Sequence, residues 1–237
     1  MGTKWSEIIT EHAMVFIDDV RLSEKAEENY ALFLREMSLY MKNAVPVFDR
    51  PPEMRDYLSV GMTEARYTDA QWTSTIESLG DATTVETGNI GYDAFSCAIR
   101  ETQADGTVIL TPYDGAEYDR ETGDVSFPAQ KDIGIEYDMD FYADGEFPHD
   151  LSAAQKRILG LCVACVWDER FFRDWLKDAP KVHDRSFNAP NEAQYMEKGN
   201  KKKLQNRGLL NEELSKYAQD CEYANVFRGR RGRFELI

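Results

Sequence analysis

The amino-acid sequence predicts an α+β fold: a helical bundle core of about four helices, the last of them long, with an inserted antiparallel β module. Apolar residues recur every three to four positions near both ends of the chain, whereas apolar and polar residues alternate in its middle. Most of the net charge of −15 also falls in that middle segment. The expected domains are 1–60 and 151–227 as two parts of the helical core, 61–150 as the acidic module, and 228–237 as a basic tail.

Two helices are expected near the N-terminus. Helical spacing predicts the first, with Thr3 or Ser6 as its N-cap. Its packed side should comprise Trp5, Ile8, Ile9, His12, Ala13 and Phe16. The second helix should begin at Ser23, a good N-cap, and stop before Pro46. Its buried face should hold Tyr30, Leu34, Met37 and Met41.

The middle of the chain has the pattern of strands. Residues 82–142 are rich in β-formers, with turns at ADGT, YDGAEY and ETGD. The clearest strand is DIGIEYDMDF. Its apolar face should hold Ile133, Ile135, Tyr137, Met139 and Phe141, and its solvated acidic face Asp132, Glu136, Asp138 and Asp140. Residues 64–79 fit a short helix or a strand equally well.

Helical patterns return after residue 151. Ser152 and Gln155 have the spacing of a capping box, so a helix should start there and end before Pro180. The last long helix should span about 191–227, and glycines at 199 and 208 could bend it.

The charge is concentrated in one segment. Residues 61–150 hold 20 acidic and four basic side chains, a balance of −16, while the rest of the chain is near neutral. This asymmetry indicates an inserted module, whose acidic surface would aid solubility. No apolar run approaches the ~20 residues of a membrane span, and four cysteines form no disulfide framework in a chain of 237 residues.

The candidate reactive residues are better explained by packing or solvation. Cys162 and Cys165 have C-x-x-C spacing, but they lie inside a predicted apolar helix and have no second pair, so we expect buried thiols. The acids near Asp144-Gly145 do not follow the EF-hand order. The histidines are scattered: His12, His149 and His183. We therefore expect no catalytic residue, cofactor site or metal ligand, and predict that the protein is not an enzyme.

The basic residues are more suggestive of an interaction. Those near the start of the last helix are Lys198, Lys201, Lys202, Lys203 and Arg207. Four arginines and three apolar residues follow in the tail RGRRGRFELI: Arg228, Arg230, Arg231, Arg233, Phe234, Leu236 and Ile237. Because the whole chain is acidic, we favour docking to a protein partner, or plain solubility, over binding to nucleic acid.

With the acidic module set aside, the helical segments resemble the head–tail connector (adaptor or neck) proteins of tailed bacteriophages. The resemblance lies in WSEIITEHAMVFIDDVRLSEKAEENYALFLREMSLYMKNAVPVF, in FPHDLSAAQKRILGLCVACVWDERFF, and in NAPNEAQYMEKGNKKKLQNRGLLNEELSKYAQDCEYANVF. It covers about 140 residues and rests on the order and pattern of the helices.

The resemblance implies a structural virion protein with no cofactor and no membrane contact. Such subunits form a ring, typically a dodecamer, that joins the portal protein to other neck and tail proteins. Genomic DNA passes through the channel without sequence-specific binding. The protein would lie in the neck of the virion, and in the host cytoplasm during assembly. The tail residues Arg228 to Ile237 would dock into a neighbour or partner.

Two other functions stay open at the sequence level. One is a small intracellular α+β hydrolase that uses carboxylates such as Asp138 or Asp140. The other is an acidic inhibitor or DNA mimic that binds a basic partner through residues 61–150. The sequence also leaves open whether the acidic module faces the channel or the outside.

Overall fold

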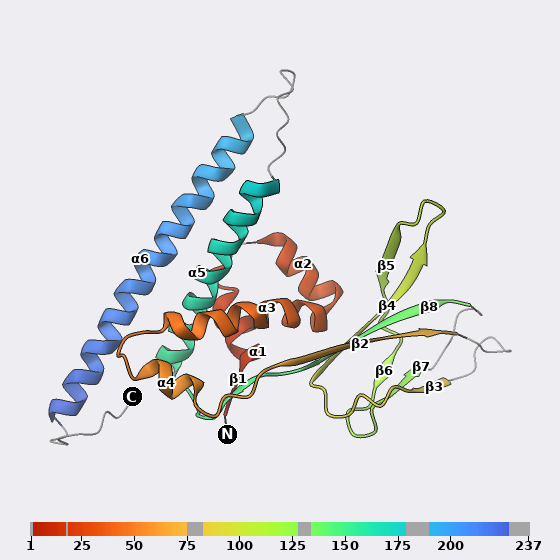
Figure 1. Cartoon of the computed structure of the whole chain (residues 1–237), viewed down its shortest axis with the longest axis horizontal. Helices are drawn as coiled ribbons and strands as arrows, with labels where there is room; N and C mark the ends of the chain where they lie inside the picture. The colour runs from red at the N-terminus through yellow and green to blue at the C-terminus, as the bar shows by residue number, and fades with distance from the viewer. Residues whose placement is uncertain (1, 18, 75–82, 128–133, 179–189, 228–237) are drawn as a thin grey trace. The chain divides into compact units, whose positions relative to one another are not determined.

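The computed structural model has the α+β architecture expected from the sequence (Figure 1). It describes residues 2–17, 19–74, 83–127, 134–178 and 190–227. The chain divides into two compact units. The helical unit comprises Met1–Asp18, Leu39–Met62 and Phe147–Ile237, and the β-rich unit comprises Asp19–Ser38 and Thr63–Glu146. The domain boundaries drawn from the sequence stay predictions.

The helical unit contains most of the helices. Its elements are β1 (Thr3–Lys4), α1 (Trp5–Glu7) with a π-helical continuation (Ile8–Ala13), the end of α3 (Tyr30–Ala44), a 3₁₀ turn (Val45–Val47), α4 (Met54–Ser59), α5 (Ala153–Asp178) and α6 (Pro190–Phe227). Strand β9 (Glu146–Phe147) leads back into this unit. As expected, α3 ends before Pro46.

The first helix begins differently from the prediction. Its N-cap is Lys4, which makes no side-chain cap bond, and Ser6 lies inside α1. Thr3 is engaged elsewhere: its hydroxyl donates to the carbonyl oxygen of His149 (3.1 Å) and accepts from the backbone N–H of Leu151 (2.8 Å). A hydroxyl that holds a distant loop is not available as a cap, so this prediction was wrong.

The second predicted helix is two helices, because Asn29 interrupts it. The first, α2 (Val20–Glu28), is capped by Asp19, so Ser23 lies within a helix and is not its start. Asn29 then caps α3: its side-chain oxygen accepts from the backbone N–H of Leu32 (2.8 Å). A side chain that satisfies a free N–H of the next helix stabilises a new start at that position.

The buried face predicted for this stretch is largely confirmed. Leu34, Met37 and Met41 are buried, whereas Tyr30 is 40% exposed. In the first segment, Trp5, Ile8, Ile9 and Ala13 are buried, and His12 and Phe16 are half-buried.

The start of α5 confirms the capping box. The backbone N–H of Ser152 donates to the side-chain oxygen of Gln155 (2.8 Å), and the N–H of Gln155 reaches the hydroxyl of Ser152 (3.4 Å). Helix α5 ends at Asp178, and α6 runs beside it as one helix through both of its glycines (Figure 1).

Helix α5 also approaches the N-terminal helix closely. A methyl group at Gly160 would lie 2.7 Å from Cβ of His12 and 2.8 Å from its carbonyl carbon. Only glycine allows this contact, because atoms closer than about 3 Å would overlap.

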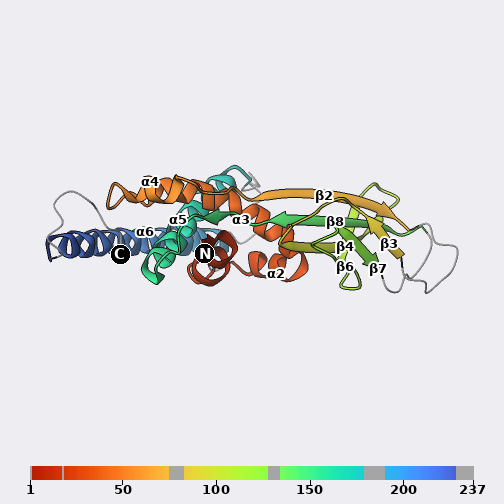
Figure 2. The same cartoon turned by 90° about the horizontal axis from the view of Figure 1, so that it is seen from below.

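The β-rich unit contains two antiparallel sheets. The four-stranded sheet has the order β2 (Arg66–Thr73), β8 (Glu136–Ala143), β4 (Ala94–Thr102), β5 (Val108–Pro112), and Figure 2 shows its first three strands side by side. The three-stranded sheet has the order β3 (Thr83–Glu86), β7 (Asp124–Phe127), β6 (Glu117–Tyr118). Strand β2 settles the ambiguous stretch as far as it is described: it is a strand.

An aromatic core lies between the two sheets. It is formed by Cys97, Val125, Phe127, Tyr137, Met139 and Phe141, with Trp72, Phe95, Tyr113 and Tyr118 packed against it. Phe127 lies 4.8 Å from both Trp72 and Tyr137, measured between ring centroids. The apolar face predicted for β8 is confirmed from Tyr137 to Phe141, while Asp132 and Ile133 lie outside the described residues.

Among the described helices, none combines the length and apolar character needed to cross a bilayer.

Candidate functional site

The residues expected to dock into a partner are those of the tail. Arg228, Arg230, Arg231, Arg233, Phe234, Leu236 and Ile237 all lie outside the described residues. Their role therefore stays a prediction.

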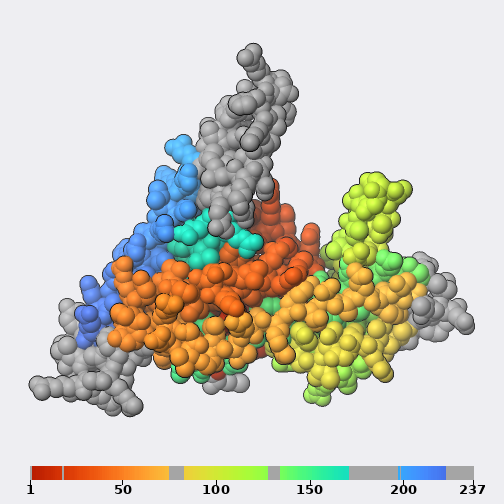
Figure 3. Space-filling model, viewed as in Figure 1, coloured from red at the N-terminus to blue at the C-terminus, as the bar shows by residue number. Residues whose placement is uncertain are grey.

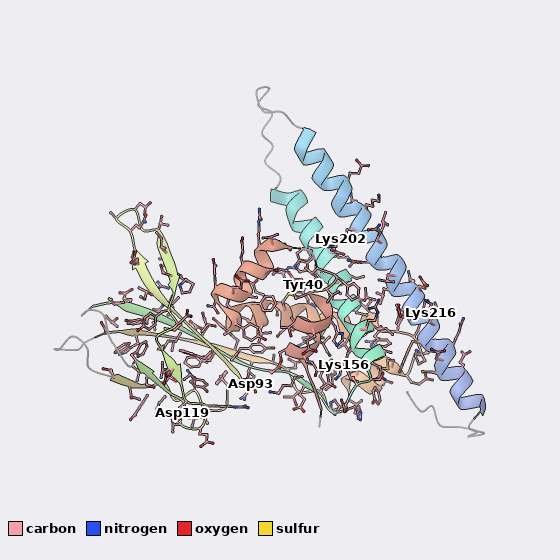
Figure 4. All side chains as sticks on the ribbon, turned by 180° about the vertical axis from the view of Figure 1, so that it is seen from behind. Tyr40, Asp93, Asp119, Lys156, Lys202 and Lys216 are labelled. Carbon is pink, nitrogen blue, oxygen red and sulfur yellow. The ribbon has the colours of Figure 1, made fainter. Side chains whose placement is uncertain are left out.

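The basic cluster predicted on α6 faces α5 at one end. Arg207 forms an ion pair with Glu169 of α5 (2.7 Å). Lys202, labelled in Figure 4 beside α5, and Lys203 both act electrostatically on Asp168. Lys201 is exposed, and the side chain of Lys198 is not described. At least part of this cluster thus serves the contact between the two helices.

A buried polar pair joins α5 to α6. The carboxylate of Asp168 is 3% exposed and accepts from the side-chain amide of Asn206 (3.0 Å). Burial raises the pKa of Asp168, while the amide of Asn206 and the charges of the nearby lysines lower it without cancelling the rise. A buried polar pair between two helices helps to fix their register, because a slip separates the two groups.

The sequence contains a signal for this pair. Asp168 follows Leu161 and Cys165 at spacings of four and three, which places it on their buried face. Asn206 heads a similar series on α6: Leu210, Leu214, Tyr217 and Cys221, all buried. A polar residue in register with an apolar stripe on each of two neighbouring helices could have been proposed as a pair.

The thiols are buried, as predicted. Cys162 is fully buried and Cys165 is 6% exposed. Burial raises the pKa of Cys162, and burial together with the charge of Asp168 raises the pKa of Cys165 to about 12. Because the thiolate is the reactive form, these side chains are unreactive near neutral pH.

The carboxylates of β8 are less solvated than predicted. Glu136 is exposed, but Asp138 and Asp140 are half-buried and each has a structural partner. Asp138 accepts from the guanidinium of Arg100 at 3.0 and 3.1 Å. The face predicted to be solvated is therefore only partly exposed at two of its described positions.

Asp140 of β8 lies beside the start of α3, within the β-rich unit. Its oxygens accept from the amide of Asn29 (2.5 Å) and from the hydroxyl of Tyr67. The guanidinium of Arg35 lies over the ring of Tyr67, 4.1 Å from its centroid. Ser96 of β4 adds a bond from the backbone N–H of Ala31 (3.1 Å). Segment 19–38 therefore covers this part of the sheet, which the alternating pattern of β8 alone did not indicate.

The remaining candidates are not brought together. Asp144 accepts from the hydroxyl of Tyr142 (3.2 Å). His149 stacks on Tyr57 at 4.3 Å, His12 packs near Gly160, and His183 lies outside the described residues. No group of three or more His, Cys, Asp or Glu side chains could hold a metal ion in the described part of the chain.

Strand β5 is the most exposed apolar segment of the β-rich unit. Its five residues are all exposed, and Val108, Ile109 and Leu110 are consecutive, with exposed fractions of 42%, 40% and 48%. The β4–β5 hairpin projects from the rest of its unit (Figure 3).

Charge is divided unequally between the two units. The β-rich unit holds 24 acidic and seven basic residues, a net charge of −17, whereas the helical unit, tail included, has a net charge of +2. Asp93 and Asp119, labelled in Figure 4, belong to the acidic unit, and Asp93 pairs with Arg120 (3.0 Å).

Comparison of the chain with protein-family models, with curated proteins and with solved structures finds no match.

Proposed function

We propose that the protein is a structural component of a virion, a ring-forming subunit of the head–tail connector between the portal and the tail. The helical segments that suggest this family in the sequence form α1, α3, α5 and α6, and the structure adds the shorter helices α2 and α4. The ring would be assembled in the host cytoplasm and retained in the virion neck, with DNA passing through its channel.

The observation that carries the proposal is the separation of charge. A closed ring of identical subunits needs two different, complementary faces on each subunit. The β-rich unit, with a net charge of −17, and the basic tail of the helical unit, with four arginines and one glutamate, provide such complementarity within one chain. Attraction between the tail of one subunit and the acidic unit of the next favours head-to-tail association and disfavours symmetrical pairing of the acidic units.

The candidate reactive groups support a structural role as well. The thiols are buried and protonated near neutral pH, and the carboxylates of β8 are bound by Arg100, Asn29 and Tyr67. These side chains hold elements together, so we do not propose the hydrolase that the sequence left open.

Electron microscopy of the purified protein, alone and mixed with the portal protein, tests the proposal. We expect closed rings that stack on the portal. A protein that stays monomeric and does not bind the portal would contradict the connector function.

Removal of residues 228–237 tests the part assigned to the tail. We expect the truncated chain to keep its circular dichroism spectrum and to lose ring formation or portal docking. The matched control replaces only the four arginines of the tail by glutamine, which keeps its length and removes its charge. If the truncated chain assembles normally, the tail has no docking role.

A DNA-mimic or inhibitor function remains a second candidate, because the acidic charge of the β-rich unit would also attract a basic partner. It predicts binding to a basic host protein that weakens steeply with salt and does not need residues 228–237.

A further inference from the structure

The exposed hairpin and the tail have complementary chemistry. We propose that strand β5 (Val108–Pro112) is the receptor for the C-terminal tail (residues 228–237) of a second copy of this chain, which adds to it as a further antiparallel strand. This inference rests on the proposed function, because it names the contact that would link neighbouring subunits of the ring.

The outer edge of β5 has no neighbouring strand among the described residues, since β5 is last in the order β2-β8-β4-β5. The register shows which backbone groups point outward. The N–H of Gln103 bonds to the carbonyl of Thr107 (2.8 Å), and the N–H of Tyr113 to that of Cys97 (2.9 Å). Hydrogen-bonded pairs alternate in an antiparallel ladder, so the backbone N–H and C=O groups of Ile109 and Thr111 point towards β4.

The backbone groups of Val108 and Leu110 therefore point away from β4. Their N–H and C=O groups, with the carbonyl of Pro112, offer an incoming strand two donors and three acceptors. An edge with consecutive exposed apolar residues and no charge is unusual, because such edges pair readily with other chains. The opposite edge strand, β2, carries Arg66 and Asp69. The unprotected edge is thus β5.

The side chains on this edge suit the tail. Val108 and Leu110 lie two residues apart, so they share one face of the strand. In the tail, Phe234 and Leu236 have the same spacing. An antiparallel register with Phe234 opposite Leu110 and Leu236 opposite Val108 places all four apolar side chains together.

Charge selects the tail over other strands. The tail carries four arginines and one glutamate, whereas the unit that bears β5 has a net charge of −17. Pairing of β5 with a second β5 would bring two such acidic units together, which repulsion opposes. The basic cluster of α6 cannot add a strand, because its backbone is already bonded within the helix.

Disulfide trapping between full-length chains tests the contact. One chain carries Leu110→Cys and the other Phe234→Cys, and the two are mixed under mild oxidation without the portal. The native cysteines interfere little, because all four are at most 7% exposed. We expect a dimer linked between the two variants on a non-reducing gel, formed at least tenfold faster than in the control mixture with Ile109→Cys, whose side chain lies on the other face. Equal rates, or no linked dimer, would overturn the inference.

A second measurement covers the case in which cysteine at an anchor position weakens the contact. Sedimentation of the full chain with Val108→Thr and Leu110→Thr should show at least tenfold weaker self-association, and Ile109→Thr should stay within twofold of the parent. Unchanged association of the double variant would overturn the inference. The two proposals fail separately: rings on the portal without the linked dimer keep the connector function alone, and the linked dimer without portal binding keeps the tail contact alone.

Discussion

The two units of this protein are stabilised in different ways. In the helical unit, the helices pack closely enough that only glycine fits at position 160, and polar pairs such as Asp168 with Asn206 are buried between helices. In the β-rich unit, aromatic rings fill the space between two sheets and acidic residues cover the outside. The stability of the first unit depends on how closely its helices approach, and the stability of the second depends on the size of its buried side chains.

This difference gives the substitutions in each unit a different expected cost. Hydrogen exchange read by mass spectrometry reports on peptides from each unit separately, and urea unfolding gives the change in free energy.

The largest loss is expected at the centre of the aromatic core. Phe127→Ala removes a fully buried ring that contacts Trp72, Tyr113 and Tyr137. Loss of such a ring typically costs about 3–5 kcal/mol in the free energy of unfolding. Exchange should rise first in peptides of β4, β7 and β8. Phe127→Leu is the matched control, and its free energy of unfolding should fall by less than half as much. A loss below ~1 kcal/mol for the alanine variant would show that the packed rings do not stabilise the unit.

In the helical unit the corresponding effect comes from adding atoms. Gly160→Ala places a methyl group against the backbone of His12 and Ala13, so α5 or the N-terminal helix must shift. Overpacking of this kind costs about 2–3 kcal/mol.

Gly208→Ala in α6 is the matched control, because nothing lies within 4 Å of the added methyl group. We expect this variant to be as stable as the parent, or more stable by up to about 1 kcal/mol, since alanine favours a helix. Urea unfolding of the two variants checks both expectations. Equal stability of the two variants would contradict the close approach at Gly160.

The sequence predicted those features that depend on neighbouring residues. The pair Ser152 and Gln155 identifies the start of α5 because both members of the capping box lie within one turn. The alternation of β8 identifies its buried face for the same reason. Asn29 was missed because the apolar spacing continues across it, and its second partner, Asp140, lies 111 residues away.

The candidate site was predictable to a smaller extent. The tail stands out by composition, but its proposed receptor does not, because VILTP is one of several β-rich stretches within residues 82–142. That β5 is an exposed edge follows only from the order of strands in the sheet, which a single sequence does not determine. The half-buried state of Asp140 likewise depends on where segment 19–38 packs, which a single sequence does not determine.

A smaller, pH-dependent effect is expected at the buried polar pair. Asn206→Leu removes the amide that donates to Asp168, which leaves a buried carboxylate without that donor. We expect a loss of about 2 kcal/mol at pH 7, because hydrogen bonds to charged groups contribute about 1.5–3 kcal/mol.

The direction of the pH dependence follows from the pKa of Asp168. Burial raises it in the folded chain, and loss of the amide raises it further. Asp168 then binds a proton more readily in the folded chain than in the unfolded chain. The loss of stability caused by its buried charge is therefore complete above the folded-state pKa, and it declines as the pH falls towards the unfolded-state pKa. The difference from the parent should therefore shrink between pH 7 and pH 4. In the Asp168→Asn background the same substitution should lose this pH dependence, and an unchanged slope would contradict the role given to Asp168.

The smallest effect is expected at the start of α5. Ser152→Ala removes the hydroxyl that accepts from the backbone N–H of Gln155, which costs about 1 kcal/mol for a typical N-cap. Ser59→Ala is the matched control: its exposed hydroxyl donates only to a carbonyl of its own helix, Arg55, so its loss should be near neutral. Because both residues belong to the helical unit, exchange should rise at the start of α5 and stay unchanged in β8. An equal rise in hydrogen exchange in β8 would mean that loss of the cap destabilises both units together.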